Sequence, residues 1–401
     1  MLNDAKDAIY NGGPFQSYWW ADEHEPVHPA VRLTLKHPVD EDALKKAWDK
    51  MKKLYPLFDA VPEDFDDEIL FFRGEGESVP VRSEHVLKIA SEAVLYRGFS
   101  LTFFEETITL SAYHSLVDEI GLMKITSDLM WLYFSLKNGT EARLSVNTEN
   151  REPEEYFIQS TMLSPDGYEP QSVMLYHDIR HIFSDPEAAN DENGIMTGKV
   201  ILSADEFDEL CAGADAEPDE MIACVMAKAV YTLFPEERRA LSLGFMTDFR
   251  KVFGVCDTIA PCSKKMPLVL EYDEVMNGDG KEAAGKIASV RKIQKSDDYI
   301  KSHVAMENTY AVLNIRNACV SVNYAGTFDI GESTSEITDI SMSDYSGSSL
   351  FMVYLGDEVH ISLQYGKMTE KYQKAVKDVL VESGLSKVEV SEPYRIEKEI
   401  G

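Results

Sequence analysis

The chain has 401 residues, of which 44% are hydrophobic and 27% are charged, and its formal net charge is −31. A chain of this length exceeds what one simple core usually holds, so we expect two lobes of an ordinary globular protein. Nucleic-acid binding depends on basic side chains that neutralise phosphates, so 70 acidic residues against 39 basic ones exclude a nucleic-acid partner. Anionic membranes are disfavoured for the same reason, and any acidic partner would need a local basic patch.

The sequence carries no pattern typical of export or membrane insertion. Charged residues interrupt the first thirty positions, and no later stretch approaches the roughly 18 to 20 apolar residues of a membrane span. We therefore expect a cytoplasmic protein. Its cysteines are spaced like neither a zinc motif nor a redox pair, so we expect free thiols and no bound metal. The cysteines are Cys211, Cys224, Cys256, Cys262 and Cys319.

The first part of the chain alternates between strand and helix patterns. Asp40 precedes apolar residues at helical spacing, so a helix is expected from there until Pro56 stops it. A second helix is expected over 120–136, closed by Gly139. Strands are predicted over 31–37, 68–73 and 107–113.

A weakly patterned segment divides the chain in two. Between about 139 and 196 the sequence is polar, rich in turn formers and without periodicity, which indicates a crossover between lobes. Beyond it, strands are predicted over 198–203, 241–246, 319–324, 350–355 and 358–365, and helices near 204–213, 218–234 and 369–383. Two rounds of alternating strands and helices predict a mixed α/β fold with an N-terminal lobe over 1–138, a connection over 139–197 and a C-terminal lobe over 198–401.

His114 stands where a predicted strand ends, four residues before Asp118 and the next predicted helix. Functional side chains usually project from such junctions, so this imidazole is a candidate for chemistry. The pattern H-x-x-x-D is short, and by itself it fits a structural histidine better than a catalytic one. The landmarks that surround it shift this balance toward catalysis.

In the order of its landmarks, the chain resembles the superfamily of chloramphenicol acetyltransferase and the condensation domains. The segment around His114 is similar to the family signature H-H-x-x-x-D-G, with His114 at the second, catalytic histidine and Asp118 at the aspartate. The stretch Phe245–Arg250 resembles the family strand that ends in D-h-R, where Arg250 matches the arginine. Further similar segments are the helix that begins after Asp40, its exit at Leu54–Phe58, the strand Ser321–Gly326 and the hairpin Gly356–Tyr365.

This resemblance implies a mixed α/β, two-lobed chloramphenicol acetyltransferase-like fold with a tunnel between the lobes. It also implies an acyltransferase that moves an acyl group from a thioester, with acyl-coenzyme A as co-substrate, to a hydroxyl or amine of a small molecule. His114 would be the general base that takes a proton from the acceptor, a role worth roughly 10² to 10⁴ in rate. Asp118 would pair with Arg250 and fix the loop that presents the histidine. The resemblance implies neither a metal nor a tightly bound cofactor.

Two residues depart from the family pattern. Tyr113 replaces the first histidine, which relatives often tolerate, and Glu119 replaces the glycine that follows the aspartate. Glu119 adds bulk and negative charge beside the base. A carboxylate there favours the charged form of an imidazole and can also obstruct the substrate. Gly121, two positions on, is expected to restore some flexibility.

Three functions therefore remain open. The first is a coenzyme-A-dependent acyltransferase. The second is a catalytically degenerate member, in which Glu119 spoils the site and the protein serves as a binding or scaffold protein. The third is a free-standing condensation enzyme that takes its acyl group from a carrier protein, a partner that the net charge disfavours. Ser321, Asn323 and Thr247 are equal candidates for stabilising the reacting oxygen.

Overall fold

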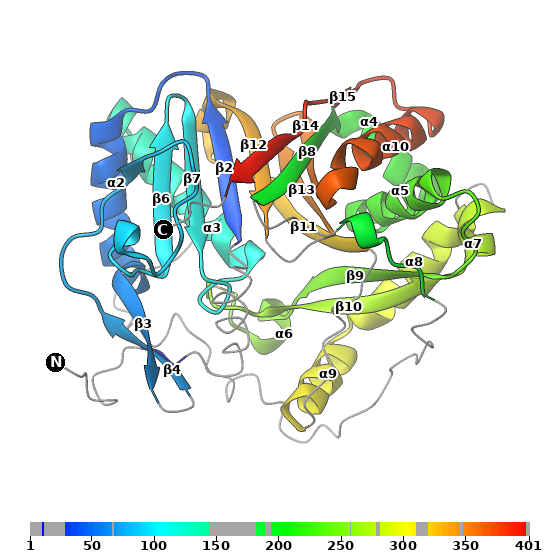
Figure 1. Ribbon diagram of the computed structural model, residues 1–401, viewed down its shortest axis with the longest axis horizontal. Coiled ribbons are helices and arrows are strands. Elements are labelled where there is room, and N and C mark those ends of the chain that lie inside the picture. Colours follow the sequence, from blue (N-terminus) through cyan, green and yellow to red (C-terminus); the bar gives the residue numbers. More distant parts are fainter. Residues whose placement is uncertain are drawn as a thin grey trace.

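The protein folds into two lobes that lie side by side, and each lobe is built on a β-sheet (Figure 1). The computed structural model describes residues 10–11, 29–65, 68–144, 182–188, 194–256, 258–277, 281–309, 320–344 and 348–397. Strands and helices alternate in both lobes. The mixed α/β architecture that the sequence predicted is therefore confirmed.

The N-terminal lobe has a five-stranded sheet in the order β12-β2-β7-β6-β5. Two helices, α2 and α3, pack against each other and against one face of this sheet. A small sheet in the order β1-β4-β3 completes the lobe. The elements are β1 (Tyr10–Asn11), β2 (Ala30–Leu35), α2 (Glu41–Leu54), β3 (Ala60–Phe65), β4 (Glu68–Arg73), β5 (Val81–Arg82), β6 (Phe99–Phe104), β7 (Thr107–Ala112), α3 (Glu119–Asn138) and β12 (Ile337–Ser343).

Both helices of this lobe begin and end where the sequence signals predicted. The Asp40 carboxylate accepts a hydrogen bond from the backbone N–H of Ala43 at 3.0 Å, which satisfies one of the free donors at the start of α2. Helix α3 ends at Gly139, whose φ of 68° lies in the left-handed region that favours glycine. It begins at Glu119, one position earlier than expected.

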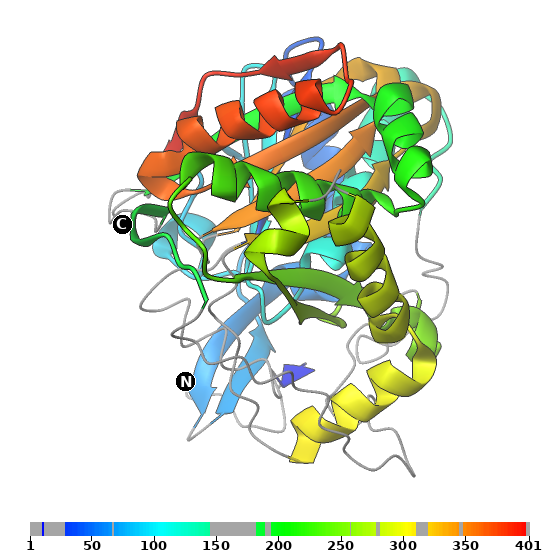
Figure 2. The ribbon, with the colours of Figure 1, turned by 90° about the vertical axis from the view of Figure 1, so that its right-hand side faces the viewer.

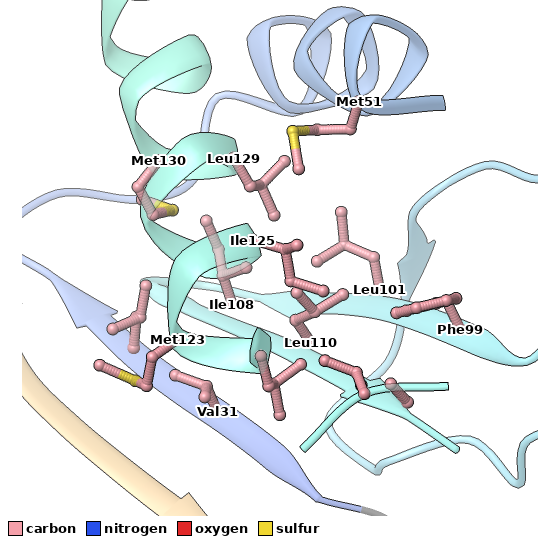
Figure 3. Packing of buried hydrophobic residues seen from close by; sticks show 14 of the residues in the cluster. Val31, Met51, Phe99, Leu101, Ile108, Leu110, Met123, Ile125, Leu129 and Met130 are labelled. Carbon is pink, nitrogen blue, oxygen red and sulfur yellow. The ribbon is translucent and has the colours of Figure 1, made fainter. Parts of the chain in front are cut away.

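The core of the N-terminal lobe lies between its sheet and the two helices (Figure 3). Ile125 and Leu129 of α3 lie over Ile108 and Leu110 of β7, and Met51 of α2 closes the cluster from above. Because side chains alternate along a strand, this packing fills only one face of the sheet. The other face is free to carry polar residues.

The C-terminal lobe has a larger sheet in the order β10-β9-β11-β13-β14-β8-β15, and β16 also pairs with β8. Helices cover one face of this sheet, as the view of Figure 2 shows. The elements are β8 (Gly194–Ser203), α4 (Ala204–Ala214), α5 (Pro218–Leu233), β9 (Leu241–Asp248), α6 (Arg250–Phe253), β10 (Ser263–Leu270), α7 (Tyr272–Met276), α8 (Lys281–Gln294), α9 (Asp297–Thr309), β11 (Val320–Phe328), β13 (Ser349–Leu355), β14 (Glu358–Gln364), α10 (Thr369–Glu382), β15 (Val388–Val390) and β16 (Tyr394–Glu397).

Strand β12 joins the two lobes. It comes from the later part of the chain, yet it pairs antiparallel with β2 and forms the edge of the N-terminal sheet. In this register Ile337, Ile340 and Met342 lie opposite Leu35, Leu33 and Val31, so β12 adds three side chains to the N-terminal core. The backbone N–H of Met342 also donates to the Ser362 hydroxyl of β14 in the other lobe.

Sequence patterns missed several elements and misplaced some ends. Strands β6, β10 and β12 and helix α9 were not predicted, and β8 begins at Gly194 instead of residue 198. Strands β6 and β12 are mostly buried and lack a regular alternation of polar and apolar residues, and β10 contains Pro267, a residue that is rare inside strands. No helix in the described part of the chain has the length and apolar character that crossing a lipid bilayer requires.

Candidate active site

His114 lies in the link between β7 and α3, at the border of the two lobes. The backbone N–H of Tyr113 donates to the carbonyl of Gly98, which ties the start of this link to the neighbouring chain segment. Leu116 and Val117 are fully buried in the N-terminal core and anchor its other half. The His114 side chain remains 12% exposed. The link therefore holds the imidazole firmly while leaving part of the ring accessible.

Asp118 is the buried residue that connects this link to helix α3. Its Oδ1 accepts hydrogen bonds from the backbone N–H of Gly121 at 2.8 Å and from Arg250 Nη2 at 2.6 Å. Its Oδ2 accepts from the backbone N–H of Cys262 at 2.9 Å. Burial alone would raise the pKa of this carboxyl, but the charge and hydrogen bond of Arg250 outweigh it and hold the pKa below its usual value. Asp118 is therefore an ionised helix cap.

Arg250 is a residue of the C-terminal lobe that contacts Asp118. It follows β9 at the start of α6, and its guanidinium is 1% exposed. Besides Asp118 it donates to the carbonyls of Thr258 and Ala260 and to the carboxylate of Asp248. The ion pair between Asp118 and Arg250 that the family resemblance implies is thus present, and it fastens one lobe to the other beside His114.

Gly121 allows the helix to approach the other lobe closely. A Cβ atom built on this residue would lie 2.1 Å from the carbonyl oxygen of Ile259 and 2.7 Å from a methyl group of Val117. The sequence suggested that Gly121 supplies flexibility beside Glu119, but in the structure it lies in the first turn of α3 and supplies space.

We expect Gly121→Ala to lower the free energy of unfolding by about 1–3 kcal/mol, because a backbone carbonyl cannot yield as a flexible side chain can. Chemical denaturation followed by circular dichroism would measure this change. Gly139→Ala is not a suitable comparison because its φ is positive. Gly285→Ala, at a site in α8 with no atom within 4 Å, should be neutral or slightly stabilising. Equal stability of the two variants would contradict the close approach.

Glu119 lies directly beside the imidazole. Its Oε1 is 3.8 Å from Nε2 of His114, and its side chain is 3% exposed. Burial raises the pKa of this carboxyl; His114 and Lys265 act in the opposite direction, and Asp344 and Asp118 add to the rise. Lys265 belongs to β10 of the other lobe, and its Nζ lies 3.9 Å from Oδ2 of Asp344, the residue that follows β12.

Polar side chains cover the face of the C-terminal sheet that is turned toward the N-terminal lobe. In β11, Val322 and Tyr324 pack on the helix side, so Ser321 and Asn323 point the opposite way. The amide group of Asn323 is 1% exposed, and both Oδ1 and Nδ2 lack a hydrogen-bond partner within the described residues. Neighbouring strands add further polar residues to this face, namely Ser349, Ser362, Gln364, Thr197 and Lys199.

The structure distinguishes the three residues considered for the reacting oxygen. Thr247 already accepts a hydrogen bond from Arg291 Nη1 at 2.8 Å, on the far side of the sheet where α8 packs. Ser321 pairs with Ser349 in the strand register. Asn323 alone of the three has a buried polar group with unused donors and acceptors within the described part of the chain. Its free donor makes it the best candidate.

A surface pocket with basic residues lies on the polar face of the N-terminal sheet. It is small, with a cavity volume of about 30 Å³. Arg32 lines it from β2 and Arg395 from β16, so the pocket bridges strands of both lobes. The remaining lining residues are Ala30, Glu84, His85, Val86, Thr109, Ser341 and Ser343. This pocket provides positive charge on a protein that is otherwise strongly acidic.

The described cysteines contribute no obvious nucleophile. Cys211, Cys224, Cys256 and Cys262 are free, and Cys319 lies outside the described residues. Burial raises the pKa of the Cys262 thiol, the one nearest Asp118, to about 12. A thiol of this kind is almost entirely protonated at neutral pH.

The two sheets lie side by side, with His114 and Asp118 in the link at their border, and this two-lobed fold is similar to that of solved condensation domains and of TRI101. Solved structures confirm this fold. Polyketide synthase associated protein 5 from Mycobacterium tuberculosis aligns with 93% of this chain and 98% of its own, at a TM-score of 0.69 and 13% identity. TRI101 of F. graminearum, complexed with coenzyme A and T-2 mycotoxin, aligns with 91% of this chain and 96% of its own, at a TM-score of 0.61 and 10% identity.

A condensation domain is equally similar. A variant of the starter condensation domain of rhizomide synthetase, in complex with C8-CoA, aligns with 92% of this chain and 94% of its own, at a TM-score of 0.60 and 14% identity. No protein-family model matches the chain, and no curated protein matches its sequence. At these identities the likeness establishes the fold, and the site residues of this chain must carry any argument about function.

Proposed function

We propose that this protein transfers an acyl group from a thioester, with acyl-coenzyme A as donor, to a hydroxyl or amine of a small molecule. The observation that carries the proposal is the setting of His114. Its ring is partly accessible at the border of the lobes, and a buried ion pair holds the loop that presents it. A histidine that is both rigid and reachable suits a general base, which must meet the acceptor in a fixed geometry.

In the proposed reaction His114 takes the proton of the acceptor as its oxygen or nitrogen attacks the thioester carbonyl. The tetrahedral intermediate carries a negative oxygen, and a buried donor such as Nδ2 of Asn323 is suited to stabilise it. Collapse of the intermediate releases the thiolate, which receives the proton from His114. Neither step consumes a metal or a bound cofactor.

The basic pocket supports coenzyme A as the donor. It reaches Thr109 of β7, which is five positions before His114, so the two residues lie at most roughly 17 Å apart at about 3.4 Å per residue. The pantetheine arm has about 13 bonds between phosphorus and sulfur, and at about 1.2 Å per bond it spans roughly 16 Å. A phosphate near Arg32 and Arg395 would therefore place the thioester near His114.

The test is the release of thiol from acyl-coenzyme A donors of two to eight carbons, with panels of primary alcohols and amines as acceptors. Acyl transfer predicts acceptor-dependent thiol release and an acylated product that mass spectrometry detects. Thioesters loaded on a carrier protein, assayed in parallel, identify the condensation enzyme if they alone react. A protein that binds these ligands without turnover would be the degenerate member, and the proposal would then fail.

Asn323 gives a prediction in which stability and activity move in opposite directions. We expect Asn323→Leu to raise the free energy of unfolding by about 1–3 kcal/mol, because the buried amide has no partner in the described residues, and to lower kcat/KM for acyl transfer. Thr247→Val is the control, since it removes an existing bond to Arg291 and should destabilise. Loss of stability in both variants would contradict the role of Asn323.

A further inference from the structure

Glu119 and His114 lie close enough together to bind the same atom of the acceptor. Two atoms 3.8 Å apart, as Oε1 of Glu119 and Nε2 of His114 are, can both reach a third atom at about 2.8–3.0 Å. The backbone of Glu119 is fixed at the start of α3, where the Asp118 cap holds the N–H of Gly121, and its side chain is buried beside the imidazole. A nitrogen that carries several hydrogens can donate to both groups at once.

Among the residues that the structure describes, Glu119 in its ionised form is a negative charge without a fixed cation. Asp118 is paired with Arg250 at 2.6 Å, and Asp344 faces Lys265 at 3.9 Å. Glu119 has no lysine or arginine within ion-pair distance among the residues that the structure describes, and its Oε1 accepts no hydrogen bond there. A buried carboxylate in this state is costly unless a cation joins it. The site is therefore complementary to a single positive charge.

We propose that Glu119 selects a primary amine as the acceptor, by binding its ammonium group next to His114. This inference rests on the proposed acyl transfer and narrows the acceptor from a hydroxyl or amine to an amine. It also gives a use to the glutamate that stands where the family signature has glycine. Glu119 is then a specificity-determining residue instead of an obstruction.

The proton balance of N-acylation requires two acceptors, and this site has two. A primary amine enters as R–NH₃⁺ and loses one proton to the carboxylate of Glu119, which leaves the nucleophilic lone pair. The amine attacks the thioester carbonyl, and His114 takes the second proton as the C–N bond forms. When the C–S bond breaks, His114 returns its proton to the thiolate. The products are the amide, the free thiol and one proton, which leaves Glu119 for solvent. An alcohol needs only one of these two bases.

The direction in which the pKa of Glu119 is shifted is consistent with binding of an ammonium group. Burial raises the pKa of its carboxyl, while His114 and Lys265 oppose the rise and Asp344 and Asp118 add to it. An arriving ammonium ion favours the carboxylate, so its binding should release a proton wherever Glu119 was protonated beforehand. A neutral alcohol brings no charge and should release none.

The test compares acceptors that differ only in the nucleophile, 2-phenylethylamine and 2-phenylethanol, with octanoyl- and acetyl-coenzyme A as donors. Wild-type protein should have a higher kcat/KM for the amine. Glu119→Gln should lower kcat/KM for the amine by roughly 10- to 100-fold relative to the alcohol, because it removes a charge-assisted hydrogen bond and one proton acceptor. Glu332→Gln, an exposed site with the same change of charge, should leave the ratio unchanged.

Calorimetric titration of the amine in two buffers of different ionisation enthalpy gives a second measurement that needs no turnover. At any pH at which Glu119 is protonated before the amine binds, proton release should be present in wild type and absent in Glu119→Gln, so the titration is repeated over a range of pH. Preference of the wild type for the alcohol, or an equal loss of both activities in Glu119→Gln, would overturn the selection of an amine and leave acyl transfer standing. No thiol release with either acceptor, together with amine binding that Glu119→Gln does not change, would overturn both.

Discussion

His114→Ala is expected to lower kcat/KM for acyl transfer by about 10²- to 10⁴-fold, the usual contribution of a general base. Without the imidazole, the acceptor must lose its proton to water while it attacks the thioester. Binding and orientation of both substrates should survive, so a residual rate above the uncatalysed reaction is expected. The measurement is acceptor-dependent thiol release under conditions far below saturation by either substrate.

The matched control is His37→Ala, which removes an exposed imidazole just after β2. It should leave the rate unchanged. Circular dichroism should give the same spectrum for both variants, because His114 is not part of the hydrophobic core. Equal rates for His114→Ala and the wild type would remove the proposed base, and with it the acyl-transfer proposal in its present form.

Asp118→Asn is expected to lower the free energy of unfolding by about 3–5 kcal/mol, because it leaves the buried guanidinium of Arg250 without its charge partner. The asparagine still offers an oxygen to the N–H of Gly121, but its amide nitrogen cannot accept from the N–H of Cys262, so the expected loss includes that hydrogen bond as well as the ion pair. Asp248→Asn is the control. It removes a second carboxylate from the same arginine, but Asp248 is 38% exposed, and its loss should cost about 1 kcal/mol or less.

The ion pair also predicts how stability depends on pH. The folded-state pKa of Asp118 is lowered from its ordinary 3.8, so its contribution is fully present above about pH 4 and is lost as the pH falls further. Wild-type stability should therefore decline below pH 4 more steeply than that of Asp118→Asn, and the two curves should converge in acid. Parallel curves would show that the pair is not ionised. A loss of activity in Asp118→Asn at pH 7 without a loss of stability would point to a direct catalytic role.

Local signals in the sequence predicted the parts of the fold that local interactions determine. The cap at Asp40, the termination at Gly139 and the apolar spacing of α2 each act within a few residues, and each is found in the structure. The pairing of Asp118 with Arg250 joins residues far apart in the chain, and only the family resemblance suggested it. Length and pattern predicted two lobes of mixed α/β structure, and the resemblance narrowed this prediction to the chloramphenicol acetyltransferase-like arrangement.

Other features depend on contacts that no local pattern encodes. The sequence left open whether Glu119 obstructs the site or assists His114, since its sequence position says nothing about the Lys265 of β10 and the Asp344 after β12 that act on it. Asn323 could not be separated from Ser321, because the hydrogen-bond partners of a strand residue are set by the whole sheet. The pocket at Arg32 and Arg395 combines strands from opposite ends of the chain.

Strand β12 comes late in the chain but completes the N-terminal sheet, and this order affects folding during synthesis. Strand β2 is complete at Leu35, but the partner that covers its edge ends only at Ser343. A ribosome that adds roughly 5–20 residues per second therefore leaves this edge open for on the order of 15–60 s. An open edge can recruit other chains. The nascent protein thus passes through a vulnerable period in which a chaperone would protect it from aggregation.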